Sequence, residues 1–381
     1  MSVLEILEQL IRFQTLPEQP NAELLGYVAE HLRLAGVEPA LIMEPCGERG
    51  GLVALIGPRV PGGIVLSAHS DVVAVEGQQW NVPAWRLTSD SGRLYGRGTA
   101  DMKGFIACCL DLLADIDVTR LKRPLILAIS HDEEIGCKGA PMLVRHIAAM
   151  PRPAAVIVGE PTSMRIVDGH KGVAVYETRV RGRAGHSSLP HTAASAILAA
   201  AQLIVRLEDI AAKRREAPRQ DCAFSPSCTT VNVGIVRGGE ASNIVAAECV
   251  LRWDVRAIPG DDAQSILEEL HEYCDRVVVP RMRLTAPDAG IVTQVFASAP
   301  PLSPQGSSAA RELAMRATQE PSSSVVSFTT EAGLFQQAGM SAVVCGPGSI
   351  EQAHKPDEFV EVSQLQDCSR FLRRMVEELS A

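Results

Sequence analysis

The sequence predicts an α/β protein in which a mostly parallel sheet is sandwiched by helices and a smaller α+β domain is inserted into the chain. Up to His170, short continuous apolar runs alternate with segments of helical periodicity, which is typical of buried parallel strands and their connecting helices. After His170, apolar and polar residues alternate, which indicates strands with one exposed face. The later elements follow the order β-α-β-β-α-β, which describes a small layered domain.

The first part of the chain is expected to contain four helices and four strands. Amphipathic periodicity places helices at 3–12, 21–35, 100–116 and 139–150, and Gly36 ends the second of them. Apolar runs place strands within 52–57, 64–68, 123–134 and 154–162. Because the last two runs end in acids, polar side chains are expected just beyond these strands.

The inserted domain is expected to begin with an alternating strand at 173–183 and an alanine-rich helix at 192–213. The remaining elements are strands at 229–237 and 247–256, a helix at 261–277 and a strand at 291–297. The segment "SAPPLSPQGSSA" then precedes further helices and the strand "SAVVCG". We therefore expect catalytic-domain segments at 1–171 and 299–381, with the inserted lid or dimerisation domain at 172–298.

Composition narrows the functional class. The 381 residues are 46% hydrophobic and only 4% aromatic, and the net charge of −9 disfavours binding to a nucleic-acid backbone. The ten cysteines show no CxxC spacing, and several lie in apolar runs, which indicates reduced thiols in a cytoplasmic protein. The N-terminus lacks the pattern of a signal peptide, and no run approaches the roughly 20 apolar residues of a membrane span.

Histidines and acids follow successive predicted strands. In α/β folds, the residues just past the strands face the crevice where ligands bind. Imidazole and carboxylate groups are ligands of divalent metals such as zinc, and a pair of ions needs one carboxylate that can bridge them. The residues in question are His69, Asp71, Asp101, Glu133, Glu134, Glu160 and His354.

Each of these residues, taken alone, is more often a solvated loop residue or a helix cap than a ligand. Their recurrence at successive strand ends favours a common site. Converging carboxylates repel one another and raise their own pKa values, and a bound cation removes that repulsion.

Six motifs, in order along the chain, resemble those of the di-zinc aminoacylase and succinyl-diaminopimelate desuccinylase family of metallopeptidases. They are "HSDVV", "GRGTADMKG", "HDEEIGCKG", "GEPT", "GHSSLP" and "AHKPDE". The resemblance covers nearly the whole chain, including the inserted domain. It implies a zinc-dependent amide hydrolase that acts on a small N-acyl amino acid, with a homodimer formed through the inserted domain.

The resemblance also implies which residues hold two zinc ions in each subunit. Asp101 matches the bridging carboxylate, His69 and Glu160 match the ligands of one ion, and Glu134 and His354 match those of the other. Cobalt and manganese ions accept similar ligands, so the identity of the native metal stays open.

Further residues match catalytic positions of the family. Asp71 matches an acid that fixes the tautomer and orientation of His69. Glu133 matches the general base, which takes a proton from the attacking water and delivers it to the leaving nitrogen. The alternative for Glu133 is a helix cap or a surface acid. The family also carries a cis peptide bond after the residue that matches Asp101.

Three residues of the inserted domain match substrate-side positions. His186 matches a histidine that stabilises the tetrahedral oxyanion in the partner subunit's site, and Asn243 and Arg256 match residues that hold the substrate carboxylate and the oxyanion region. The alternatives are a histidine beside the Ser187–Ser188 capping pair and a solvated arginine on a strand face.

The region around Glu331 bears on the substrate. The stretches "TEAGL" and "CGPGSIEQAHKPDEFV" resemble acetylornithine deacetylases more than desuccinylases. Glu331 could pair with the ornithine ammonium group, or it could simply favour a helix N-terminus. The expected reaction is therefore hydrolysis of N2-acetyl-L-ornithine to ornithine and acetate. The alternatives are another N-acyl-amino-acid amidohydrolase, such as a desuccinylase, and a metal-free scaffold of the same fold.

Overall fold

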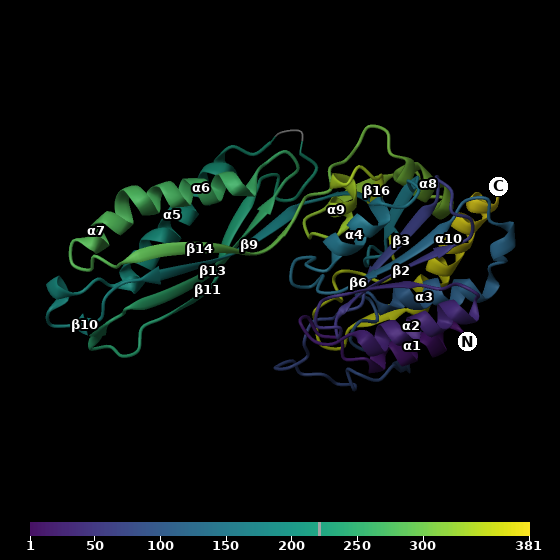
Figure 1. The fold of residues 1–381 in the computed structure, drawn as a ribbon, viewed down its shortest axis with the longest axis horizontal. Helices are drawn as coiled ribbons and strands as arrows, with labels where there is room; N and C mark the ends of the chain where they lie inside the picture. The colour runs from purple at the N-terminus through teal and green to yellow at the C-terminus, as the bar shows by residue number, and fades with distance from the viewer. Residues whose placement is uncertain (220–221) are drawn as a thin grey trace. The chain divides into compact units, whose positions relative to one another are not determined.

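The computed structural model describes residues 1–219 and 222–381. The chain divides into two compact units (Figure 1). Unit 1 contains Met1–His170, Leu302–Val325 and Thr330–Ala381, and unit 2 contains Lys171–Pro301 and Val326–Thr329. Unit 1 is thus built from segments on both sides of an insertion.

Unit 1 is organised around an eight-stranded sheet of order β1-β2-β6-β3-β7-β16-β8-β15. Its strands are β1 (Ala40–Met43), β2 (Gly50–Ile56), β3 (Ile64–His69), β6 (Leu125–Ser130), β7 (Ala155–Val158), β8 (Ile166–His170), β15 (Ser323–Val326) and β16 (Ala342–Val344). The central strands β6, β3, β7 and β16 pair in parallel, whereas β1, β2 and β8 pair with their neighbours in the antiparallel direction. The mostly parallel core of the predicted sheet is confirmed.

Helices cover both faces of this sheet (Figure 1). They are α1 (Val3–Arg12), α2 (Ala22–Leu34), α3 (Lys103–Asp115), α4 (Ala140–Ala148), α8 (Ala309–Thr318), α9 (Ala332–Gln337) and α10 (Val362–Ser380). Apolar residues of α1, α2, α3, α8 and α10 form one core with alternate residues of the strands, and α4 and α9 lie against the opposite face. Every residue of β3 is buried, because both of its faces are covered.

A small antiparallel sheet beside the main one links two distant parts of unit 1. Its strands are β4 (Thr88–Asp90), β5 (Arg93–Tyr95) and β17 (Phe359–Glu361), in the order β17-β5-β4. Phe359 pairs with Tyr95 and Glu361 with Arg93. The pairing therefore brings the segment before β17 next to the segment after β5.

Unit 2 has a four-stranded antiparallel sheet of order β11-β13-β9-β14, with helices on one face (Figure 1). The elements are β9 (Gly172–Arg181), β10 (Gly185–His186), α5 (Ala196–Glu216), β11 (Thr230–Gly238), β12 (Ile244–Val245), β13 (Glu248–Ala257), α6 (Ala263–Tyr273), α7 (Val279–Arg283) and β14 (Gly290–Ala299). Burial alternates strictly along β13, as expected for a sheet with one covered face.

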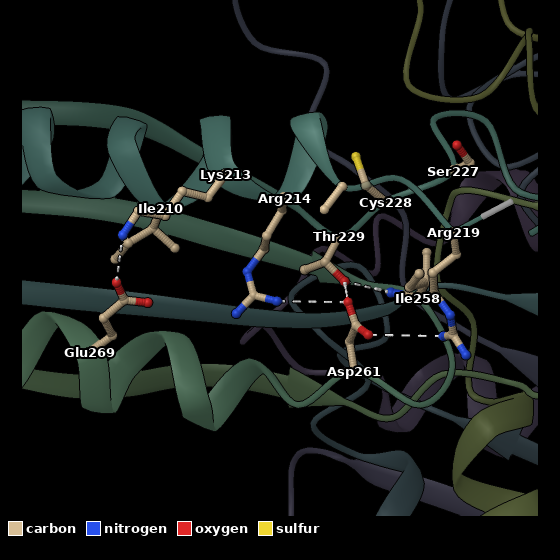
Figure 2. A pocket seen from close by; sticks show the side chains of 11 residues that line it. Ile210, Lys213, Arg214, Arg219, Ser227, Cys228, Thr229, Ile258, Asp261 and Glu269 are labelled. Atoms are coloured by element: carbon tan, nitrogen blue, oxygen red, sulfur yellow. Dashed lines mark hydrogen bonds and ion pairs between the residues drawn. The ribbon is translucent and has the colours of Figure 1, made fainter.

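The C-terminal part of α5, the chain that follows it and residues next to and within α6 line a pocket of about 270 Å³ in unit 2 (Figure 2). Asp261 lies on its wall, where its carboxylate accepts a hydrogen bond of 2.5 Å from the Thr229 hydroxyl. The guanidinium groups of Arg214 and Arg219 lie 3.8 and 3.9 Å from the same carboxylate. Asp261 thus ties the start of α6 to the end of α5.

Two helices of unit 2 differ from the expected ranges. The helix expected at 192–213 begins at Ala196, because the Ser195 hydroxyl caps it by accepting a bond of 3.2 Å from the Leu198 N–H. The helix expected at 261–277 continues past α6 through a π-helical segment, Cys274–Val278, into α7. Among the described residues, no helix combines the length and the apolar character needed to cross a membrane.

Trp253 is central to the core of unit 2. Its side chain is 1% exposed, its indole N–H donates a 2.9 Å bond to the Thr178 hydroxyl, and its ring stacks on Tyr176 at 4.3 Å between centroids. We expect Trp253→Ala to lower the free energy of unfolding of unit 2 by about 3–5 kcal/mol, because it leaves a cavity. Urea unfolding followed by far-ultraviolet circular dichroism measures this loss. Leu284→Ala, at an 85% exposed position, is the control and should change it by less than about 0.5 kcal/mol. Equal effects of the two substitutions would contradict the placement of Trp253 in the core.

Candidate active site

The carboxyl ends of parallel strands in unit 1 bring the predicted ligands to one edge of the sheet. His69 is the last residue of β3, Glu133 and Glu134 follow β6, and Glu160 follows β7. Because β3 pairs in parallel with both β6 and β7, these three strand ends are neighbours. Asp101 arrives from the turn before α3, and its peptide bond to Met102 is cis, as the resemblance implied.

The Asp101 carboxylate lies between two histidines. Its Oδ1 is 3.0 Å from Nε2 of His69, and its Oδ2 is 3.3 Å from Nε2 of His354. His69 Nε2 also lies 3.6 Å from Oε1 of Glu160, and His354 Nε2 lies 2.9 Å from Oε2 of Glu134. Each oxygen of Asp101 therefore faces a different histidine and acid pair, which is the arrangement that a bridging ligand requires.

The donor set fits divalent cations. Glu134 and Glu160 each have a buried oxygen, Oε1, that lacks a hydrogen-bond partner. Ligand atoms of His69, Asp101 and Glu134 lie within 4.8 Å of one another, and so do those of His69, Glu133 and Glu160. Buried carboxylate oxygens without partners are costly, and a bound cation would satisfy them. By distance alone, Glu133 and Glu134 are both within reach of a metal.

The pKa shifts of the site residues also favour a bound cation. Burial raises the pKa of Glu133 to about 8 and that of Glu134 to about 7, and it raises the pKa of Glu160 well above its usual range. Hydrogen bonds to Asp101 and Glu134 raise the pKa of His354 to about 10. These three glutamates and His354 thus favour bound protons, and divalent cations would supply the same compensating positive charge.

Asp71 connects the first histidine with the two glutamates. The His69 Nδ1–H donates to the backbone carbonyl of Asp71 at 2.9 Å, while the nearer carboxylate oxygen is 3.6 Å away. The carboxylate instead accepts the backbone N–H groups of Glu133 and Glu134, at 3.2 and 3.1 Å. The main chain of Asp71 therefore orients His69, and its side chain fixes the turn that carries both glutamates.

Cys137 is a site residue that the sequence reasoning missed. Its buried thiol donates to Oε1 of Glu133 at 3.2 Å, and its backbone adopts a left-handed φ of 57°. The Cys137 N–H also donates to the Glu133 carbonyl at 2.8 Å, which closes the turn. The only available signal was the position of the cysteine in "HDEEIGCKG".

Glu331 is the residue directly before α9, at the N-terminus of this helix. It is 1% exposed, and both of its carboxylate oxygens accept hydroxyl bonds, one from Ser67 on β3 and one of 2.8 Å from Ser130 on β6. Burial raises the pKa of Glu331, and the two serine hydroxyls oppose that change. The structure therefore gives Glu331 a clear contact with both central strands.

A second cluster, formed by Glu44, His131 and Asp132, borders the same turn. Arg49 already neutralises it, because its guanidinium lies 2.5 Å from Glu44 and 3.3 Å from Asp132. A metal ion would have to compete with this cation, so the cluster is better described as an ion-pair network.

The remaining predicted residues belong to unit 2. His186 and Asn243 are neighbours, since β10 pairs with β12 and the Asn243 carbonyl accepts the Ser187 N–H at 2.9 Å. The exposed His186 ring accepts a 3.1 Å bond at Nδ1 from the Ser188 N–H. Arg256 lies on β13, with its side chain 42% exposed and 3.1 Å from Asp254.

Comparisons with known proteins agree with this fold and site. Residues 65–378 match the model of peptidase family M20/M25/M40. An acetylornithine deacetylase from Myxococcus xanthus is 36% identical over 97% of this chain and 95% of that protein, and one from Proteus mirabilis is 33% identical over 94% and 90%.

Solved structures share the fold. A metallo-carboxypeptidase of the M20 family from Sulfolobus solfataricus is 19% identical and superposes with a TM-score of 0.77 over 100% of this chain and 99% of that one. Human carnosine dipeptidase 1 is 14% identical, with a TM-score of 0.75 over 99% and 96% of the two chains. The chain therefore belongs to peptidase family M20/M25/M40, a family of metal-dependent hydrolases.

Proposed function

We propose that the protein is a zinc-dependent amide hydrolase that converts N2-acetyl-L-ornithine to L-ornithine and acetate, a step of arginine biosynthesis. The observation that carries the reaction class is the placement of Asp101 between two histidine and acid pairs. Support for the substrate comes from the two acetylornithine deacetylases that match nearly the whole chain.

We propose that Asp101 would be the ligand shared by two zinc ions, and that His69 and Glu160 would hold one ion and Glu134 and His354 the other. The Oε1 atoms of Glu134 and Glu160, which accept no hydrogen bond, support this assignment. Bound zinc supplies a Lewis acid that makes hydroxide available near neutral pH and polarises a carbonyl oxygen.

Glu133 is the proposed general base. It accepts the proton of the attacking water and delivers it to the leaving nitrogen, as amide cleavage requires. The Cys137 thiol holds one of its oxygens, Oε1, which leaves the other oxygen for proton transfer. The Asp71 carboxylate keeps the Glu133 main chain in place by accepting its N–H.

Roles toward the substrate are proposed for four further residues. Arg256 offers a planar guanidinium to the substrate carboxylate, Asn243 binds the carboxylate and oxyanion region, and His186 donates to the developing oxyanion in the partner subunit's site. Glu331 is proposed to favour the cationic ornithine side chain. A direct contact with the ammonium group would require Glu331 to exchange one of its two serine bonds.

A homodimer through unit 2 and a cytoplasmic location complete the proposal. Val292 and Val295 on β14 are 59% and 56% exposed, which is apolar surface that a second subunit could cover. The ten cysteines are free thiols, as expected in a reducing compartment.

Substitution of Glu133 tests whether this residue acts as the general base or as a metal ligand. We expect Glu133→Ala to keep its bound metal and to lose about 10²- to 10⁴-fold in kcat, because only proton transfer is removed. Glu134→Ala is the matched comparison, and it should lose metal. Metal analysis by mass spectrometry, together with a deacetylation assay, measures both effects. Loss of metal from Glu133→Ala alone would mean that the roles of the two glutamates are reversed.

Metal removal tests the cation requirement. We expect a chelator to abolish activity and lower Tm, and zinc to restore both, since a ligand at 100 times its Kd stabilises the folded state by about 2.7 kcal/mol. Differential scanning calorimetry measures the shift. In the control variant Asp101→Asn, zinc should raise Tm less than in the wild-type protein. If zinc did not change the Tm of the wild-type protein and metal addition restored no activity, the alternative of a metal-free scaffold would be favoured.

Substrate choice is tested with a panel of N-acyl amino acids. We expect kcat/KM for N2-acetyl-L-ornithine to exceed that for N-acetyl-L-methionine and N-succinyl-diaminopimelate. Glu331→Gln should reduce the value for acetylornithine by about 10- to 100-fold, the cost of losing a hydrogen bond to a charged group, and should affect acetylmethionine less. An equal loss for both substrates would restrict Glu331 to bracing β3 and β6.

A further inference from the structure

Glu358 is a buried acid outside the proposed ligand set, four residues after His354 and directly before β17. Its side chain is 1% exposed. The antiparallel pairing of β17 with β5 continues through a 2.9 Å bond from the Gly96 N–H to the Glu358 carbonyl. This pairing directs Glu358 at the loop 96–101, which ends at Asp101.

Both carboxylate oxygens of Glu358 are used to hold that loop. Oε1 accepts the backbone N–H groups of Ala100 and Asp101, at 2.9 and 3.1 Å. Oε2 accepts the N–H of Gly98 at 3.0 Å and the guanidinium of Arg97 at 2.7 Å. Four donors therefore converge on a single carboxylate, and one of them is the main chain of the proposed bridging ligand.

Arg97 connects the same hydrogen-bond network with the loop that carries His354. Its Nη1 donates to the Lys355 carbonyl at 3.3 Å, and its Nη2 donates to Oε1 of Gln78 at 2.6 Å. Gln78 in turn donates from Nε2 to the His354 carbonyl at 2.9 Å. The loops that carry Asp101 and His354 are thus tied together through Glu358 and Arg97.

We propose that Glu358 is a positioning residue that sets the placement of Asp101 relative to His354 and thereby the affinity of the site for its metal ions. This inference rests on the proposed function, in which Asp101 bridges two cations. Only a carboxylate can accept all four donors, because a glutamine would present its own N–H₂ group to two of them. A donor left unpaired in a buried loop shifts until it finds a partner, and Asp101 would move with it.

The test uses the full-length protein and cobalt(II), whose visible absorption reports on ligand geometry. Glu358→Gln removes the charge and two acceptor sites, and Glu358→Asp keeps the charge but withdraws the carboxylate by one methylene group. We expect both variants to bind cobalt about 10- to 100-fold more weakly than the wild-type protein and to alter its absorption spectrum. Each titration is run well below the Tm of the variant concerned.

Asp168→Asn is the matched control. Asp168 is 7% exposed, belongs to unit 1 and accepts bonds from Arg311 at 2.9 Å and Ser323 at 2.8 Å. The variant Asp168→Asn therefore loses a largely buried ion pair, as Glu358→Gln does, but it leaves the contacts of the Asp101 loop unchanged. Its Tm should fall, and its cobalt affinity and spectrum should stay as in the wild-type protein.

The outcomes separate the inference from the proposed function. Wild-type cobalt affinity and spectrum in both Glu358 variants would overturn the positioning role, and so would equal changes in Asp168→Asn. If Glu358→Gln does not fold, Glu358→Asp decides on the same criteria. A wild-type protein that binds no cobalt would contradict the proposed function itself, and the inference would fall with it.

Discussion

The repulsion among carboxylates at one edge of the central sheet governs the architecture of the site. Parallel pairing of β3 with β6 and β7 brings His69, Glu133, Glu134 and Glu160 together, and Asp101 joins them from the turn before α3. Burial makes this gathering of negative charge unfavourable, as the raised pKa values of Glu133 and Glu134 record. Such a cluster is stable only if other residues hold its backbone in place and a positive charge compensates its carboxylates.

Two acids outside the proposed ligand set hold the backbone in the same way. Asp71 accepts the N–H groups of Glu133 and Glu134, and Glu358 accepts those of Gly98, Ala100 and Asp101. An acid is suited to this task because each of its oxygens can accept several donors at once. The charge of Glu358 is balanced by the Arg97 guanidinium at 2.7 Å, so its contribution to the site is to hold the backbone of the loop. Both acids thus position the site through main-chain N–H groups.

The sequence predicted those features that depend on local pattern. The helix at 3–12 and the mostly parallel sheet follow from periodicity and are confirmed, and the strand-end pattern picked out the residues that the structure gathers around Asp101. Contacts between distant segments could not be predicted from local sequence pattern. Glu358 meets Arg97 across 261 positions only because β17 pairs with β5, and the start of α5 depended on which serine acts as the cap. The motif "AHKPDE" contained Glu358, but nothing local told its role apart from that of a loop acid.

Cys137 bears on the kind of metal that the site selects. A thiolate would favour soft ions, and the thiol lies only 3.2 Å from Oε1 of Glu133. Burial raises the pKa of Cys137 well above its usual range, and the neighbouring Glu133 and Glu331 raise it further. The thiol donates to Glu133, and among the described residues it does not belong to the groups of ligand atoms that could hold a metal. Imidazole and carboxylate groups remain as the donor set, which suits zinc, cobalt and manganese. The nearby sulfur thus serves as a hydrogen-bond donor to the proposed base, Glu133.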